Sequence, residues 1–403
     1  MGLLVSTLIL AGAVAVTGSV LALRLFYVWL LILLAGWLWI TLSIRGLKFE
    51  MSPLPERAKA GTALLQEVSV SAADKLPRFG LTLQAWTNAF IGPAANIDLP
   101  SGRTARWQAN YPLPRRGRYA LGRIMVTASE PFGLLSRKTI AGNASTVIVH
   151  PAAVPMPPFS LLGLAGSGLS TRMPEALSAS ASSIREYTTG DSLRHVHWKS
   201  TAHTGKYMVK TFDADRSRHR AKNYWIILDM AAAVHSGEAA ESTAEYAVTL
   251  AASLAKKYLD GGYRLGLVTA APESLVLPAS SGQKHLTDIL DRLAVIEPNS
   301  SIPIGVLIAR HQGLFGSDAT VVVITPSTFS AMTEGYHQLT SRGATAAFFL
   351  IDGTGFGGVS PAGVGRSLIQ LGAPVYLLRR AETFPQSLQQ AARGTGWHGD
   401  SRS

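Results

Sequence analysis

The first 44 residues constrain this chain most, because Arg24 is the only ionised side chain among them. A single helix over this stretch would be about 63 Å long, whereas the hydrocarbon core of a bilayer is about 30 Å thick. Two spans of about 20 residues each, turning near Arg24, fit that thickness better. A cleaved signal peptide fits less well, since no basic residues precede the apolar run and the run is too long. We therefore predict a two-helix transmembrane hairpin over residues 1–45.

The basic residues that flank the spans predict the orientation. Arg24 stands alone at the predicted turn, whereas Arg45, Lys48, Arg57 and Lys59 follow the second span. Lys and Arg favour the cytoplasmic side of a membrane. The sequence thus predicts a plasma-membrane protein with two spans, with residues 45–403 on the cytoplasmic side.

Composition excludes several kinds of site. The chain has no cysteine, which rules out disulfides, thiolate nucleophiles and thiolate-bound zinc or iron–sulfur centres. The net charge is +12, and a basic run lies between residues 199 and 222. Anionic plasma-membrane lipid would attract such a run, although it is also compatible with an ordinary solvated face. Few aromatic residues are interleaved with the basic ones, so we expect no nucleic-acid partner.

Residues 46–150 have the pattern of a β-sandwich. Apolar and polar residues alternate, and Gly and Pro separate the runs, as in antiparallel sandwiches. We expect strands over residues 64–72, 79–86, 118–128 and 146–150.

The remainder of the chain divides into four parts. Residues 151–183 are rich first in Pro and then in Ser, Gly and Ala, which predicts a linker. Residues 184–222 are polar and basic, and residues 391–403 form a polar tail. Between them, residues 223–390 alternate strands with helices, which favours a doubly wound α/β domain. The expected strands are 224–228, 264–269, 320–325, 346–352 and 375–378, and the expected helices are 238–259, 284–295, 332–341 and 365–371.

Two segments resemble one bacterial family. The first has Arg-Arg-Gly-Arg-Tyr at residues 115–119, Pro-Phe-Gly-Leu at 131–134 and Val-Ile-Val-His-Pro at 147–151. The second begins Ile-Arg-Glu-Tyr at residue 184, and an apolar run that ends at Asp229 follows it. It also carries Arg185, Tyr187, Gly190, Asp191, Arg194, Trp198, Lys199, Ala202, Lys206 and Lys210. Together they resemble the "domain of unknown function 58" family.

The resemblance implies an architecture and partners. Members of that family typically have two N-terminal transmembrane helices, a β-sandwich and a domain similar to the von Willebrand factor type A fold. They have no established enzymatic activity. Their genes often lie near those of MoxR-type AAA+ ATPases and transglutaminase-like membrane proteins, which makes both expected partners.

The type A resemblance also implies where a divalent cation would be held. Such domains supply an aspartate and two hydroxyls after their first strand, a donor set that suits Mg²⁺. Here the aspartate is Asp229, but the two hydroxyl positions hold Ala231 and Ala233. A later loop usually adds a second aspartate, where this chain has Thr325. We therefore expect a degenerate site with no metal and no cofactor, and a helix-capping or loop-bonding role for Asp229.

The segment from Arg185 to Lys210 allows two main interpretations of its role. It either fastens the sandwich to the α/β domain, with Trp198 over the apolar seam, or offers a docking surface for a partner or an anion. Both readings draw on the same residues: Arg185, Tyr187, Gly190, Asp191, Arg194, His197, Trp198, Lys199, Lys206 and Lys210.

The histidines of this segment suggest a third and weaker hypothesis, a catalytic metal site. His195 and His197 would share a face if they lay on a strand, and His203 or Asp191 could complete an open zinc-type site. The alternative interpretation is that these histidines are ordinary surface side chains or make structural hydrogen bonds. The leading functional hypothesis is thus a non-enzymatic, membrane-anchored scaffold that docks proteins. The alternative is a metal-dependent enzyme built on Asp191, His197 and His203.

Overall fold

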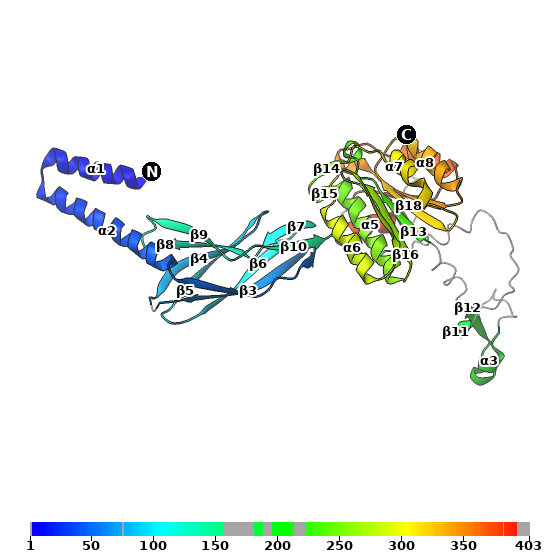
Figure 1. Cartoon of the computed structure of the whole chain (residues 1–403), viewed down its shortest axis with the longest axis horizontal. Helices are drawn as coiled ribbons and strands as arrows, with labels where there is room; N and C mark the ends of the chain where they lie inside the picture. The colour runs from blue at the N-terminus through cyan, green and yellow to red at the C-terminus, as the bar shows by residue number, and fades with distance from the viewer. Residues whose placement is uncertain are drawn as a thin grey trace. The chain divides into compact units, whose positions relative to one another are not determined.

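The computed structural model describes residues 2–74, 76–156, 181–187, 196–212, 223–381 and 383–392. The chain forms two compact units, Met1–His150 and Pro151–Ser403. Figure 1 shows the elements of each unit, coloured along the chain.

Two apolar helices open the first unit, α1 (Gly2–Thr17) and α2 (Val20–Ile44). The turn between them falls at Gly18, whose φ of +56° suits glycine after a helix end, so the predicted turn near Arg24 is wrong. Arg24 lies within α2 instead. Among the described residues, α2 is the one helix long and apolar enough to cross a membrane. With 16 residues, α1 is shorter, and it contacts α2 through a 3.1 Å hydrogen bond from Trp29 Nε1 to Thr7 Oγ1.

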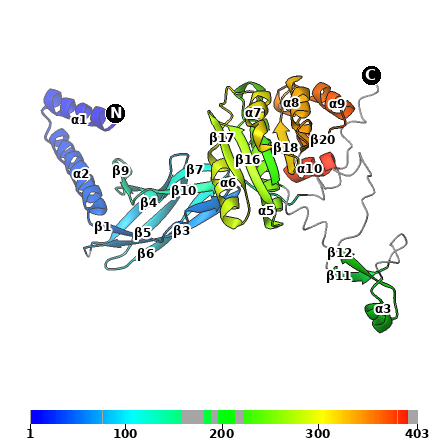
Figure 2. The ribbon, with the colours of Figure 1, turned by 45° about the vertical axis from the view of Figure 1, so that its right-hand side comes forward.

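Short sheets form the rest of the first unit (Figure 2). Their strand orders are β1-β3-β6, β5-β4-β8-β9 and β2-β10-β7, antiparallel except where β2 meets β10. Alternate residues of these strands, among them Val68, Tyr111 and Val126, are buried in one core. The strands are β1 (Leu47–Met51), β2 (Arg57–Lys59), β3 (Thr62–Ala72), β4 (Arg78–Trp86), β5 (Ile91–Leu99), β6 (Ala105–Leu113), β7 (Gly117–Leu121), β8 (Arg123–Ser129), β9 (Ser136–Ala141) and β10 (Ser145–His150).

The strand expected over residues 118–128 is in fact two strands. Gly122 separates β7 from β8 with a φ of +91°, and a Cβ there would lie 2.8 Å from the Asn143 carbonyl oxygen. This glycine lets the chain leave the sheet of β10 and enter the sheet of β4. The apolar alternation continues across the break, which is why the sequence pattern reads as one strand.

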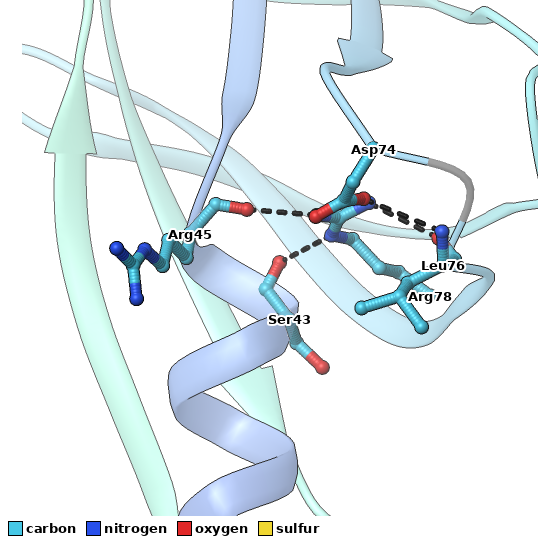
Figure 3. A network of polar contacts seen from close by, with 5 residues as sticks. All are labelled: Ser43, Arg45, Asp74, Leu76 and Arg78. Atoms are coloured by element: carbon cyan, nitrogen blue, oxygen red, sulfur yellow. Dashed lines mark hydrogen bonds and ion pairs between the residues drawn. The ribbon is translucent and has the colours of Figure 1, made fainter.

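A buried arginine joins the end of α2 to the sandwich (Figure 3). The Arg78 guanidinium donates from Nε to the Ser43 carbonyl at 2.9 Å, and from Nη2 to the Arg45 carbonyl at 2.7 Å. It also donates to the Leu76 carbonyl and forms an ion pair with Asp74 at 2.8 Å. Orphan carbonyls at a helix C-terminus require donors, and a cation there also complements the helix dipole. We call this network the Arg78 junction.

The second unit centres on a six-stranded sheet of order β17-β16-β13-β18-β19-β20, in which only the edge strand β17 is antiparallel. Helices α5, α6 and α10 bury one face of the sheet, and α7, α8 and α9 bury the other. The chain is thus mixed α/β. The elements are β13 (Asn223–Leu228), β14 (Gly237–Glu238), β15 (Glu241–Ser242), α5 (Thr243–Asp260), β16 (Arg264–Ala270), β17 (Ser274–Ser280), α6 (Gln283–Val295), α7 (Ile304–His311), β18 (Ala319–Thr325), α8 (Ala331–Thr340), β19 (Thr345–Ile351), α9 (Ala362–Gln370), β20 (Val375–Leu378) and α10 (Phe384–Ala392), with short 3₁₀ turns at Ala232–Val234, Gln312–Leu314 and Gly353–Phe356.

The predicted linker over residues 151–183 has ordered structure at both of its described ends. Its first residues pack on the α/β domain, and the Val154 amide donates to Ser253 Oγ of α5 at 3.0 Å. Its last residues begin β11 (Ala181–Glu186), which pairs with β12 (Met208–Phe212) in a hairpin that encloses α3 (Trp198–Thr204). Residues 157–180 lie outside the described residues.

Candidate functional site

Asp229 and Thr325 meet at the carboxyl edge of the six-stranded sheet. Asp229 directly follows β13, and Thr325 is the last residue of the neighbouring parallel strand β18. From β13 the sheet continues to β16 on one side and to β18 on the other, so the strand order reverses here. In open α/β sheets, ligands bind at the carboxyl ends of strands at such a reversal point.

Both carboxylate oxygens of Asp229 are engaged by the protein itself. Thr325 Oγ1 donates to Oδ2 at 2.6 Å, and the Ala231 amide donates to Oδ1 at 3.1 Å. These bonds favour the ionised form, but burial outweighs them and raises the pKa of Asp229 to about 6. No ion pair to Asp229 occurs in the described part of the chain. Asp229 therefore bonds one loop amide, in agreement with the expected loop-bonding role, and is a carboxylate that is costly to ionise.

Backbone contacts fix the loop after Asp229. The Ser300 amide donates to the Met230 carbonyl at 3.1 Å, and the Ala232 amide donates to the Ser300 carbonyl at 2.9 Å. His235 Nε2 donates to the Asp229 carbonyl at 2.9 Å, which leaves Nδ1 facing Thr243 Oγ1 at 3.0 Å. The loop is therefore held in place by the chain's own groups.

The donor set at this edge does not fit Mg²⁺. That ion demands near-ideal octahedral oxygen coordination, and the methyl groups of Ala231 and Ala233 supply no oxygen. The Thr325 hydroxyl donates to Asp229 and accepts from the Ser327 amide at 2.9 Å, while Ser300 Oγ accepts from the Ile302 amide at 3.0 Å. We therefore derive no chemistry through a metal here.

A pocket of about 610 Å³ opens beside Asp229, between α7, α8 and the loops after β13 and β18. Its lining is mostly apolar and includes Val306, Phe329 and Met332. Gln338 also lines it, and its Oε1 is a buried acceptor without a hydrogen-bond partner within the described residues. A site of this kind suits an apolar group that carries a hydrogen-bond donor.

Helix α7, one wall of the pocket, was not expected from the sequence. Its buried residues Ile304, Leu307 and Ile308 have the i, i+3, i+4 spacing of a helix, and Pro303 precedes them. That signal is only two turns long, which is why the segment reads as a loop. The edge strand β17 and the helix α10 were also unexpected.

The hairpin of β11, α3 and β12 carries part of the segment from Arg185 to Lys210. Arg185 lies on β11 and Lys210 on β12, where it pairs with Ile184. The Tyr187 ring packs edge-on to Tyr207, and Lys206 Nζ forms a 2.7 Å ion pair with Glu186. Trp198 and Lys199 are exposed on α3. Gly190, Asp191 and Arg194 lie outside the described residues, so both readings of the segment stay predictions.

His197 has a structural role. Its Nδ1 accepts from the Ser200 amide at 3.2 Å, which makes it the N-cap of α3, and the ring also contacts Ser200 Oγ at 2.7 Å. His195 lies outside the described residues, so its expected alignment with His197 stays a prediction. His203 lies in the last turn of α3. Within the described residues no three His, Asp or Glu side chains cluster as metal ligands. The enzymatic alternative stays a prediction.

Comparisons with known proteins agree with the resemblance in part. Residues 183–347 match the family model "Protein of unknown function DUF58". This stretch contains Asp229, Thr325 and the pocket walls α7 and α8, but neither the sandwich nor the apolar helices. The resemblance is confirmed for its second segment.

Two curated relatives are described as uncharacterised proteins. "Uncharacterized protein YeaD" of Bacillus subtilis (strain 168) is 26% identical over 205 residues, 48% of this chain and 47% of that protein. "Uncharacterized protein Rv1480" of Mycobacterium tuberculosis (strain ATCC 25618 / H37Rv) is 31% identical over 113 residues, 28% of this chain and 34% of that protein. The chain thus spans half or less of the length of these relatives.

Solved structures match with low scores. The CARDB domain of PF1109 from Pyrococcus furiosus aligns with 26% of this chain and 92% of its own at 15% identity and a TM-score of 0.20. Proximal thread matrix protein 1 from the mussel byssus aligns with 43% of this chain and 46% of its own at 13% identity and a TM-score of 0.30.

Proposed function

We propose that this chain is a non-enzymatic, membrane-anchored scaffold whose α/β domain docks a protein partner without a metal ion. The observation that carries the proposal is the apolar pocket at the reversal point of the sheet, beside a carboxylate already bonded to Thr325 and Ala231. A docking pocket requires only shape and apolar surface, and this pocket has a mostly apolar lining.

The strand order supports a von Willebrand type A-like fold for this domain. Numbered along the domain, its strands have the order 3-2-1-4-5-6, with the third strand antiparallel at the edge. In our proposal the partner binds at the carboxyl edge, and loss of the two hydroxyls at Ala231 and Ala233 makes docking independent of Mg²⁺.

The anchor in this proposal is the α1–α2 hairpin in the plasma membrane. Helix α2 has 25 residues and is about 37 Å long, enough to cross a hydrocarbon core of about 30 Å. Helix α1 is about 24 Å long and would serve as the second span with local thinning of the bilayer. The basic residues after α2 support a cytoplasmic location for the soluble parts.

The proposed partner is a MoxR-type AAA+ ATPase, with a transglutaminase-like membrane protein as the second candidate. We expect Val306→Glu to weaken binding of the purified ATPase about tenfold or more, because the charge would be desolvated inside an apolar contact. Val306 is 49% exposed and lines the pocket. Binding would be measured by interferometry on the full chain in nanodiscs.

Ile369→Glu is the matched control for this prediction. Ile369 is 43% exposed on α9, in the same helical layer as α7, and does not line the pocket. Its variant should bind as the wild type does. Equal loss in both variants, or binding abolished by EDTA and restored by Mg²⁺, would refute metal-independent docking at the pocket.

A further inference from the structure

Contacts between α2 and the sandwich fix which part of the sandwich lies nearest the membrane. The Arg78 junction holds the C-terminal end of α2, at Ser43 and Arg45. One turn earlier, Ile40 packs on Leu81 and Ala128. The sandwich therefore contacts the last turns of α2, whose buried residues are Gly36, Ile40 and Ser43.

The loop between β8 and β9, residues 130–135, reaches furthest back along α2 (Figure 1). It packs on Gly36, where a Cβ would lie 3.2 Å from Cγ of Glu130 and 3.4 Å from Cδ1 of Leu135. A span of about 20 residues that begins at Val20 ends near residue 39. Gly36 then lies about 5 Å inside the end of that span, so the loop reaches the outer edge of the hydrocarbon core, just below the lipid headgroups.

The β8–β9 loop is firmly built and exposes an aromatic ring. The buried Glu130 carboxylate accepts hydrogen bonds from the backbone amides of Phe132, Leu134 and Leu135, the last at 2.9 Å. Gly133 adopts a φ of +72°, which closes the turn. These contacts hold the loop backbone, yet the Phe132 side chain is 73% exposed.

Basic side chains accompany this ring. Arg137 and Lys138 are exposed on β9, directly after the loop. Phe is one of the residues that interfacial anchors bury at the boundary between headgroups and acyl chains, and Lys and Arg favour anionic headgroups. We propose that the β8–β9 loop inserts Phe132 into the membrane interface beside α2, with Arg137 and Lys138 at the lipid phosphates. The proposal rests on the membrane anchoring proposed above.

The absence of native cysteine makes the test direct, because a single introduced cysteine can be labelled without background. The full chain carrying Phe132→Cys, labelled with an NBD fluorophore, is reconstituted into vesicles of phosphatidylcholine and phosphatidylglycerol. Quenching by lipid-borne nitroxides and by aqueous iodide is then compared with Leu65→Cys. Leu65 is 61% exposed on β3, seven residues from Ala72, which pairs with Leu47 next to α2. At about 3.3 Å per residue along the strand, Leu65 is about 23 Å from Ala72 and therefore from the end of the sandwich that contacts α2.

We expect several-fold stronger nitroxide quenching and several-fold weaker iodide quenching at position 132 than at position 65. Equal iodide quenching at both sites would overturn the insertion. Protection of position 132 from both quenchers would also overturn it, and would assign the ring to a protein contact. Resistance of the chain to extraction by alkaline carbonate is measured in parallel. Extraction would refute the anchoring itself, so failure of the insertion and failure of the anchor are distinguishable.

Discussion

Replacement of Arg78 by leucine should lower the free energy of unfolding of the N-terminal unit by about 3 kcal/mol. The guanidinium is buried and donates to three backbone carbonyls, those of Ser43, Arg45 and Leu76. Leucine fills part of the space but donates to none of them, and each carbonyl left unpaired costs about 1 kcal/mol or more. Asp74 is half exposed, so its charge returns to water and adds little.

Hydrogen exchange of the full chain in detergent micelles would measure this loss. The amides of β4 and of the last turn of α2 should exchange faster in Arg78→Leu, because the Arg78 junction connects them. Arg45→Leu is the control: its backbone carbonyl is part of the junction, but its side chain is exposed and forms no hydrogen bond or ion pair in the described residues. Similar protection in the two variants would show that the junction contributes little to stability.

The Arg78 junction also shows where prediction from sequence fails. Arg78 follows Leu76 and Pro77 at the start of a strand, a context that suggests an exposed side chain. Its partner carbonyls lie 33 and 35 residues away, on a helix that the sequence assigns to the membrane. Local pattern carries no information on such a pairing, because it is decided only when the helix and the sandwich pack together.

Sequence predicts an element well when the residue pattern that indicates it runs through the whole element. All seven residues of β18 are buried, and its β-branched run predicts a strand covered on both faces. At the site, the type A resemblance pointed to Asp229 and Thr325, which the structure places at the carboxyl ends of neighbouring strands. Their direct hydrogen bond, between residues 96 apart, and the pocket beside them depend on tertiary packing. The two-turn α7 shows the same limit, since a short apolar run is ambiguous without its neighbours.

In the acid range, a pH effect on stability should come from Asp229. Folding raises its pKa from 3.8 to about 6, so between these values the native state holds a proton that the unfolded state has released. The free energy of unfolding should therefore fall as pH rises from about 4 to 6, by about 3 kcal/mol in all, and then level off. Asp229→Asn should remove this fall, because the amide carries no charge at any pH.

Urea denaturation of the full chain in detergent across this pH range would measure the effect, with Thr325→Val as a second variant. Valine removes a hydrogen bond that lowers the pKa of Asp229, so the fall should extend to higher pH. Parallel pH curves for the wild type and Asp229→Asn would mean that the carboxylate is not held as the structure shows.

Addition of Mg²⁺ distinguishes a metal site at this edge of the sheet from a docking site without metal. A bound cation would stabilise the ionised carboxylate and cancel the fall, whereas the docking site without metal proposed here requires the curve to be unchanged.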